Sequence, residues 1–494
     1  MPSTPALQTL NTNQTFNDFI LNNKENKLYL ILAIIIILLK FIIYKYLFPY
    51  PNFFVGESWD YILDARRNAP VSIYPIGYSM LLRFFSAFTI SDTALIILQY
   101  TILQAAALAL NFTLFYFYSP ARLIRILLLL SALFNPLFFP IANTISSDNF
   151  CLTLSLIWFS LLLWIIYKPT PKAILWHSFI LYLTFTVRYN AMFFILISIA
   201  ALYISKTDIK LKLAGLLIYL ILIGAYVNHN RQVYYKISGI RQFTPFSGWQ
   251  LANNALYTYR YIPDSLRLEV PDKFKNLDNT VREYFRKVKN DKNNEIEKRK
   301  AFHDYMWADE SPLWIYFRNN FPGGEHSREV KYWAKAGPLY KEYGTWIITH
   351  YPYAFFKHVI IPHIQSWFLP PMIAMDRYNF GLDYIHKSAV EWFKYKHSQI
   401  KIRLVDVNII DGLLGLYPLF TLLIHFLFWF LSIRFFIINR KGNFNPLING
   451  LILVGLFWIT NFAFNVFAGQ IEMRYLLFPV HLITVFSLLL IGLI

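Results

Sequence analysis

The sequence predicts an all-α protein that crosses a membrane many times. Of its 494 residues, 56% are hydrophobic and only 15% are charged, whereas an ordinary soluble domain has roughly 25% charged residues. Long apolar runs also recur along the chain, and most approach the roughly 20 residues that a helix needs to span a bilayer. A water-soluble fold could not bury this much continuous apolar sequence.

Taken in order, the apolar runs predict about ten transmembrane helices. They cover residues 28–48, 93–118, 123–141, 150–167, 173–187, 190–205, 212–227, 409–438, 446–467 and 474–494. The fifth and sixth runs are short, so they could form one kinked hairpin or two tilted spans. The first run is long and lacks a small-residue cleavage site, so we expect it to remain as an anchor.

Lysine and arginine residues in the short loops predict the orientation of the chain. They gather in alternate loops, and the positive-inside rule places those loops, with the N-terminus, in the cytoplasm. These cations are Lys24, Lys27, Arg122, Arg125, Lys168, Lys172, Lys206, Lys210, Lys212, Arg434, Arg440 and Lys441. The loops between them are therefore expected to be exterior.

The chain divides into three parts. Residues 1–227 form an N-terminal transmembrane module with a first exterior loop at 49–91, and residues 409–494 form the C-terminal transmembrane helices. Residues 228–408 have a soluble composition and are too long for a simple connector. We expect a small helical exterior region there, with an interfacial helix near 350–371.

The net charge of +18 does not indicate a nucleic-acid-binding protein. Lysine and arginine are spread over helix ends and the long polar region, whereas a nucleic-acid site gathers them in one patch. The single Cys151 begins an apolar run and is expected to be buried. No metal-binding motif is formed by His303, His350, His358 or His363. His358 and His363 are expected to be surface or packing residues. No cofactor is predicted, and a divalent metal stays open.

The first exterior loop carries three closely spaced acids. Glu57, Asp60 and Asp64 are three and four residues apart, so they share one face if the segment is helical. Crowded carboxylates near a membrane have raised pKa values unless a cation or metal balances them, and a general base near neutral pH needs such a value. The alternative is a solvated helix face on which Arg66 and Arg67 are the local partners.

Two arginines, Arg188 and Arg474, interrupt apolar runs at their exterior ends. A cation there is costly unless it snorkels or has a partner, so each is a functional candidate. Guanidinium groups can hold a phosphate with two hydrogen bonds and offset the charge on a departing lipid phosphate. The alternative is snorkelling, or pairing with Glu472.

The first exterior loop resembles that of a known family. An acid, a tyrosine, a small residue and a basic residue follow one another at Glu57, Tyr61, Ala65 and Arg66, and a "YPIGY" turn follows at 74–78. This order is similar to that in the lipid-dependent glycosyltransferases of the GT-C class, which include protein O-mannosyltransferases and the lipid A aminoarabinose transferase. The layout is also similar, with an acid in the second exterior loop, Asp148.

The resemblance implies the roles of several residues. Glu57 falls on the family's catalytic base, which is usually Asp, and Ser58 falls on the second acid position, as in many bacterial relatives. Asp60 is an additional nearby acid, so both Glu57 and Asp60 are candidate bases. Arg188 and Arg474 remain candidates for binding the donor phosphate because of their positions and chemistry, as argued above. Further candidates for binding acceptor or donor are Asp148, Tyr61 and Tyr78.

The resemblance also implies a function. A GT-C-like bundle in the bacterial inner membrane would move a hexose or pentose from a polyprenyl-phosphate donor to a glycan, lipid or protein acceptor at the exterior face. Two other classes stay open. A lipid-linked glycan polymerase or ligase usually relies on Arg and His in its large exterior loop, and a transporter or flippase should place charges or broken helices near mid-bilayer, often in paired halves.

Overall fold

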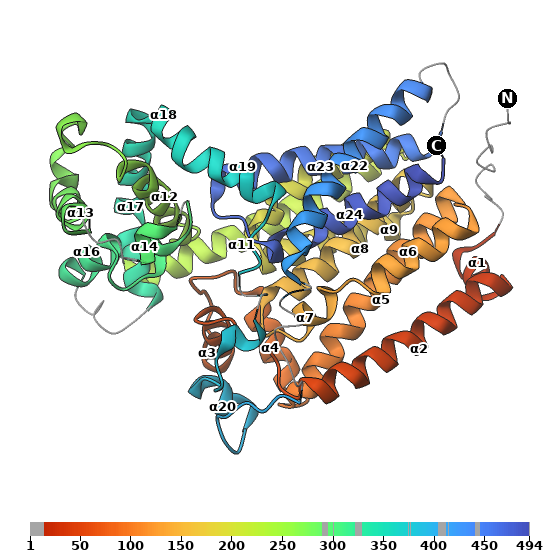
Figure 1. The fold of residues 1–494 in the computed structure, drawn as a ribbon. Coiled ribbons are helices and arrows are strands. Elements are labelled where there is room, and N and C mark those ends of the chain that lie inside the picture. The colour runs from red at the N-terminus through yellow and green to blue at the C-terminus, as the bar shows by residue number, and fades with distance from the viewer. Residues whose placement is uncertain are drawn as a thin grey trace.

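The protein is a helical membrane protein. Its computed structural model describes residues 14–288, 295–299, 301–321, 329–373, 375, 377–403, 412, 414–439 and 445–493. In this part of the chain the regular structure is helical, and extended backbone pairs only at two isolated bridges. Figure 1 shows an elongated molecule, with a bundle of long helices on one side and a cluster of shorter helices on the other.

Seven helices among the described residues are long and apolar enough to cross a membrane. They are α2 (Lys24–Leu47), α5 (Asp92–Tyr118), α8 (Ser147–Tyr167), α11 (Ile209–Ser238), α22 (Tyr417–Ile438), α23 (Leu447–Ala468) and α24 (Met473–Ile491). All seven coincide with apolar runs in the sequence. Part of the run at 409–438, and the cations Arg440 and Lys441, lie outside the described residues.

Three further predicted spans are occupied by shorter helical segments. They are α6 (Arg122–Leu133) with α7 (Phe138–Ala142), α9 (Pro171–Val187), and the 3₁₀ helix η1 (Tyr189–Phe193) with α10 (Phe194–Ile204). Residues 123–141 do not form one helix, because Pro136 disfavours helical backbone at the residue before it. The 17 residues of α9 reach about 25 Å, slightly less than a typical hydrocarbon core.

The helices of the bundle differ in how deeply they are buried. Most of α8 and α24 is buried inside the bundle, whereas α2 and α11 are largely exposed. The exposed side chains of α2 and α11 are mainly leucine and isoleucine, as expected for a surface that faces lipid. In the interior, Trp158 of α8 stacks on Phe194 of α10 with ring centroids 4.3 Å apart. Helices α8 and α24 therefore form the centre of the bundle.

Helix α11 links the bundle to the remaining helices. The apolar run at 212–227 predicts that the transmembrane span ends at residue 227, but the helix continues to Ser238. Residues 228–238 are mostly polar and contain no proline or glycine that would end a helix. In Figure 1 α11 runs from the bundle toward the shorter helices.

The shorter helices form a domain of their own, which we call the polar domain. Its helices are α12 (Phe246–Tyr259), η2 (Asp264–Leu266), η3 (Asp272–Phe274), α13 (Lys275–Val288), α14 (Glu295–Lys298), α15 (Asp304–Trp307), α16 (Pro312–Asn320) and α17 (Val330–His350). Its core includes the stacked rings of Trp249 and Trp333, 4.2 Å apart. Residues that the sequence expects to form a small helical region are thus helical and share a core.

The predicted interfacial segment near 350–371 is also helical. It consists of α18 (Pro352–Phe355), the π-helix η4 (Phe356–Ile360) and α19 (Ile361–Phe368). At its end, Phe368 stacks on Phe426 of α22, with centroids 6.0 Å apart. At its start, Tyr353 and Phe356 are exposed. The segment therefore connects the polar domain to the bundle.

The remaining elements among the described residues are small. They are α1 (Phe16–Leu21), α3 (Glu57–Arg67), α4 (Gly77–Ser86) and α20 (Lys387–Phe393), with η5 (Tyr378–Gly381) before the last of these. Helices α3 and α4 belong to the loop between α2 and α5, which we call the first loop, and α20 packs against α3. Helices α3, α4 and α20 lie at the same end of the bundle as the polar domain, whereas α1 lies at the opposite end, beside the start of α2 (Figure 1).

Candidate active site

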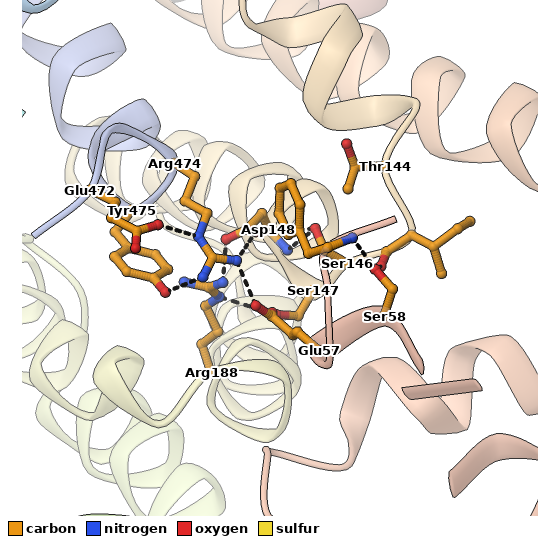
Figure 2. A network of polar contacts seen from close by, with 12 residues as sticks. Glu57, Ser58, Thr144, Ser146, Ser147, Asp148, Arg188, Glu472, Arg474 and Tyr475 are labelled. Atoms are coloured by element: carbon orange, nitrogen blue, oxygen red, sulfur yellow. Dashed lines mark hydrogen bonds and ion pairs between the residues drawn. The ribbon is translucent and has the colours of Figure 1, made fainter. Parts of the chain in front are cut away.

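Five charged side chains from four separate segments meet at this end of the bundle. They are Glu57, Asp148, Arg188, Glu472 and Arg474, which we call the charged cluster. Figure 2 shows their side chains pointing toward one another, with the two guanidinium groups between the carboxylates. Residues separated by as many as 417 positions in the sequence are thus in direct contact.

The first loop places Glu57 by backbone and hydroxyl contacts. Gly56 has a φ of 79°, a left-handed conformation that favours glycine, and this turn makes Glu57 the first residue of α3. The hydroxyl of Ser58 accepts a hydrogen bond from the amide of Phe54 (2.7 Å) and donates one to the carbonyl of Ile145 (2.5 Å). Ser58 therefore fastens the start of α3 to the loop before α8.

Asp148 lies in the first turn of α8. The Ser146 side chain caps this helix by accepting a hydrogen bond from the Asp148 amide (3.3 Å), and the helix dipole favours a carboxylate at this end. Arg188, at the end of α9, forms an ion pair with the Asp148 carboxylate. Its Nε also donates to the Ser147 hydroxyl (3.2 Å), to which the Tyr61 hydroxyl donates as well (2.9 Å).

Arg474 is the centre of the charged cluster. It lies in the first turn of α24 and contacts all three carboxylates. Its Nη1 is 2.6 Å from Glu57 Oε2 and 3.3 Å from Asp148 Oδ2, its Nε is 2.8 Å from Glu472 Oε2, and its Nη2 donates to the Tyr475 hydroxyl at 2.5 Å. One guanidinium thus joins the first loop, α8 and the segment before α24.

The charged cluster is shielded from water. The side chains of Arg474 and Glu57 are 10% exposed, and those of Asp148 and Glu472 are 1% exposed. Three carboxylates and two guanidinium groups leave one net negative charge if all are ionised. Burial raises the pKa of Glu472, and the Arg474 charge offsets this only in part. Glu472 therefore takes up a proton more readily than an ordinary glutamate.

The three acids of α3 have different surroundings, although the helix places them as the sequence predicts. Glu57 reaches the arginines, whereas burial raises the pKa of Asp64 to about 6, and this carboxyl accepts a hydrogen bond from Ser72. Asp60 is partly buried. In the described part of the chain, the ion pairs of Arg188 and Arg474 are with Glu57, Asp148 and Glu472. The interpretation of a solvated face is therefore wrong for Glu57.

Three other expectations have mixed outcomes. Arg66 pairs with Glu391 of α20, so it is not simply a local partner of the α3 acids. Tyr78 is buried, and its hydroxyl donates a hydrogen bond to the side chain of Gln99 (2.7 Å). Among the described contacts, Tyr78 lies beside the charged cluster but forms no hydrogen bond with the arginines or acids of that cluster. Cys151 is only partly buried.

Three histidines of the long polar region, His350, His358 and His363, have packing roles, as the sequence suggests for His358 and His363. The ring nitrogens of buried His363 lie near the carbonyls of Val466 and Ala301, and His350 and His358 stack on aromatic rings. Within the described residues, no group of three or more His, Cys, Asp or Glu side chains is arranged to hold a metal ion.

Two aromatic residues of the site were not identified from the sequence. The ring of Tyr475 lies 4.7 Å from the guanidinium carbon of Arg188 and 4.6 Å from that of Arg474, and the ring of Phe54 lies 4.8 Å from Arg474. Such cation–π contacts stabilise buried guanidinium groups. Tyr475 directly follows Arg474, but an aromatic residue in so aromatic a chain gives no distinctive signal.

Comparison with known proteins does not assign the chain to a family. No protein-family model, no curated protein and no solved structure matches it.

Proposed function

We propose that the protein is a glycosyltransferase of the GT-C type, which moves a sugar from a polyprenyl-phosphate donor to an acceptor at the exterior face of a bacterial inner membrane. The observation that supports this most directly is the contact between Glu57 and Arg474. A carboxylate able to accept a proton and a guanidinium able to bind a phosphate lie 2.6 Å apart in a shielded site. The loop resemblance implies the role of Glu57, and the position of Arg474 at the exterior end of an apolar run makes it a candidate for binding the phosphate.

The proposed reaction uses the charged cluster as follows. The Glu57 carboxylate takes the proton from an acceptor hydroxyl, while the hydroxyl oxygen forms a bond to the anomeric carbon of the donor sugar. The bond between that carbon and the phosphate oxygen breaks, and its electron pair leaves with the lipid phosphate. Arg188 and Arg474 offset the added negative charge on this leaving group, which is the larger part of the expected catalysis.

Donor binding requires the charged cluster to rearrange its contacts. Arg474 contacts three carboxylates, and a lipid phosphate would compete with them for its N–H groups. A phosphate also adds negative charge to a site that is already negative when fully ionised. Proton uptake by Glu472, whose pKa is raised by burial, would keep the total charge constant and release Arg474 for the phosphate.

The position of the charged cluster suits a lipid-borne donor. Asp148 and Arg474 lie in the first turns of α8 and α24, so the site is at the ends of two central helices of the bundle, where a lipid phosphate would lie in a bilayer. A donor that is already in the membrane needs no nucleotide-binding domain. The polyprenyl chain would extend from there along the apolar helices.

The decisive experiment replaces Glu57 with Gln, which is nearly isosteric and cannot take up a proton. Purified protein in detergent is supplied with polyprenyl-phosphate monosaccharides and cell-envelope glycans, and released polyprenyl phosphate is measured. A positioned base contributes about 10²- to 10⁴-fold, so Glu57→Gln should lose turnover by that factor and still bind donor. Asp60→Asn tests the second candidate base.

Glu391→Gln is the matched control, because Glu391 is a more exposed acid that also pairs with an arginine. It should retain full activity and stability. Full activity of both Glu57→Gln and Asp60→Asn would remove the first loop from catalysis, and the polymerase or transporter alternatives would then be favoured.

A further inference from the structure

Three partly exposed aromatic rings meet between the first loop and the polar domain. They belong to Tyr74, Phe246 and Trp307, which we call the aromatic shelf. Tyr74 and Trp307 are nearly parallel, with ring centroids 5.9 Å apart and planes inclined by 23°. Phe246 is 6.2 Å from each of the other two rings. The first loop, α12 and α15 thus each contribute one ring to the same surface.

The aromatic shelf adjoins the charged cluster on the side of the first loop. The Tyr74 ring lies 5.5 Å from the ring of Tyr61. The Tyr61 hydroxyl donates to Ser147, which in turn accepts a hydrogen bond from Arg188. A direct chain of contacts therefore runs from the shelf to a guanidinium of the cluster.

A second connection between the polar domain and the charged cluster runs through His303, which is close enough to Arg474 to be affected by its charge. This residue precedes Trp307 by four positions, about one helical turn, at the start of α15. His363 lies between the carbonyls of Ala301 (3.0 Å) and Val466 (2.8 Å). It thereby holds the segment before His303 against the end of α23, a few residues before Glu472.

His303 is a neutral side chain close to Arg474 of the charged cluster. Burial, followed by the charge of Arg474, lowers the pKa of its imidazole to about 3. Its Nδ1 atom is buried and has no hydrogen-bond partner among the described residues. A buried polar atom without a partner is costly, and a hydroxyl group of a bound molecule could satisfy it.

We propose that the aromatic shelf and His303 bind a sugar ring beside the charged cluster. This inference rests on the proposed function and specifies the part of that site that recognises carbohydrate. One face of a pyranose is lined with C–H groups that pack on aromatic rings, and its edge carries hydroxyls that can donate to a neutral imidazole. The ring could belong to the donor or to a glycan acceptor, because the same chemistry recognises both.

Phe246 and Trp307 pack against the core of the polar domain, with the Trp307 ring 5.3 Å from that of Trp333, but the rings of the aromatic shelf are more exposed than the core residues. Trp249 and Trp333, which also stack, are 0% exposed, and Trp314 is 4% exposed. The rings of the aromatic shelf keep part of their surface open, next to the cluster and not on the lipid-facing side of the bundle. The polar domain therefore contributes to substrate binding and does not merely cover the bundle.

The test compares Trp307→Ala, Trp307→Phe and Tyr353→Ala in the full-length protein. Tyr353 is an aromatic residue on α18 that is 75% exposed, so it controls for loss of a surface ring. Binding of polyprenyl-phosphate mannose and glucose, of bare polyprenyl phosphate, and of soluble oligosaccharides released from cell envelopes is measured by native mass spectrometry and by protection against thermal unfolding.

We expect Trp307→Ala to weaken binding of the sugar ring by about 3- to 10-fold, the effect of one aromatic contact. A loss for the sugar-bearing lipids but not for bare polyprenyl phosphate assigns the shelf to the donor, and a loss for the oligosaccharides assigns it to the acceptor. Trp307→Phe should recover most of the affinity, and Tyr353→Ala should lose none.

Equal affinity of Trp307→Ala and wild type for all sugar-bearing probes would overturn the assignment, even if wild type transfers sugar. Failure of wild type to bind any polyprenyl-phosphate lipid would instead contradict the proposed function. If Trp307→Ala unfolds, His303→Gln, which keeps a neutral polar group of similar size, tests the same surface. It should weaken binding of a sugar-bearing probe and leave binding of bare polyprenyl phosphate unchanged, and an unchanged affinity for every sugar-bearing probe would overturn the proposal.

Discussion

Replacing Arg474 with Ala should lower the stability of the protein as well as its activity. Arg474 is 10% exposed and contacts three buried carboxylates. Its loss would leave the cluster with two net negative charges and only Arg188 to balance three acids. Removing one partner of a buried ion pair costs about 3–5 kcal/mol, because the remaining charges are left uncompensated. We expect a loss of that size in the free energy of unfolding.

The loss should depend on pH in a defined direction. Burial raises the pKa of Glu472, and the Arg474 charge lowers it in part, so the raised value should rise further in Arg474→Ala. A carboxyl whose pKa is higher in the folded state makes the protein more stable as pH falls. The loss of unfolding free energy in Arg474→Ala, relative to wild type, should therefore become smaller as the pH falls from 7 to about 4.3, the ordinary pKa of a glutamate.

Denaturant titration of the purified protein in detergent, at several pH values, measures this loss. Arg66→Ala is the matched control, because Arg66 and Glu391 form a salt bridge with side chains that are 53% and 38% exposed. Such a pair contributes about 0–1 kcal/mol. If Arg474→Ala were no less stable than Arg66→Ala, or if its deficit did not change with pH, the account of the charged cluster as a buried ion network would be refuted.

Two further predictions concern the first loop. Gly77→Ala would place a Cβ atom 2.6 Å from the Thr186 carbonyl oxygen, so thermal unfolding should show that the protein loses about 1–3 kcal/mol of stability. The control is Gly224→Ala, whose Cβ atom would meet open space and which should be neutral or stabilise by up to about 1 kcal/mol. Equal stability of the two variants would contradict the packing argument. The pKa of Asp64 is raised to about 6, so this carboxyl costs stability as pH rises from about 4 to 6. Asp64→Asn should remove that dependence and gain about 1–3 kcal/mol at pH 7, and an unchanged pH profile of unfolding would show that the carboxyl is solvated.

The positions of the helices along the chain follow closely from the apolar runs, because hydrocarbon thickness and backbone hydrogen bonding leave few alternatives. The departures have local causes. The run at 123–141 is apolar throughout its middle, which conceals the break that Pro136 introduces between α6 and α7. Helix α11 extends past residue 227, because a helix does not have to end where its sequence becomes polar. Hydropathy reports the lipid-facing length and not the helix length.

The individual site residues were easier to predict than their contacts. Asp148, Arg188 and Arg474 stand at the ends of apolar runs, where a charge is conspicuous, and Glu57 is the first of three closely spaced acids in the first loop. The sequence suggests that Glu57 is crowded mainly by the other acids of α3, whereas its closest charged partner is Arg474, 417 residues away. That contact depends on how α3 and α24 are placed in space, which no local pattern contains.

The same structure explains why Glu57 and Asp60 are not equivalent. Residues three apart on a helix differ by about 60° in direction, and Asp148 and Arg474 approach α3 from one side only. Glu57, at the first helical position after Gly56, faces them. The sequence could place both acids on one broad face but could not decide which of them reaches the arginines.

The charged cluster is also the place where the chain departs from local preferences. A cation in the first turn of α24 is opposed by the helix dipole, at a cost of about 0.3–1 kcal/mol, and burial of five charges adds desolvation. Close by, Phe380 has a φ of 58°, which is strained for a bulky residue. Its ring packs on Phe54, which in turn faces Arg474. Stability alone would favour apolar residues here, and such departures are expected where a site has a function. The cost therefore favours the cluster, and not the more exposed ion pairs of the polar domain, as the site at which we propose that substrate binds.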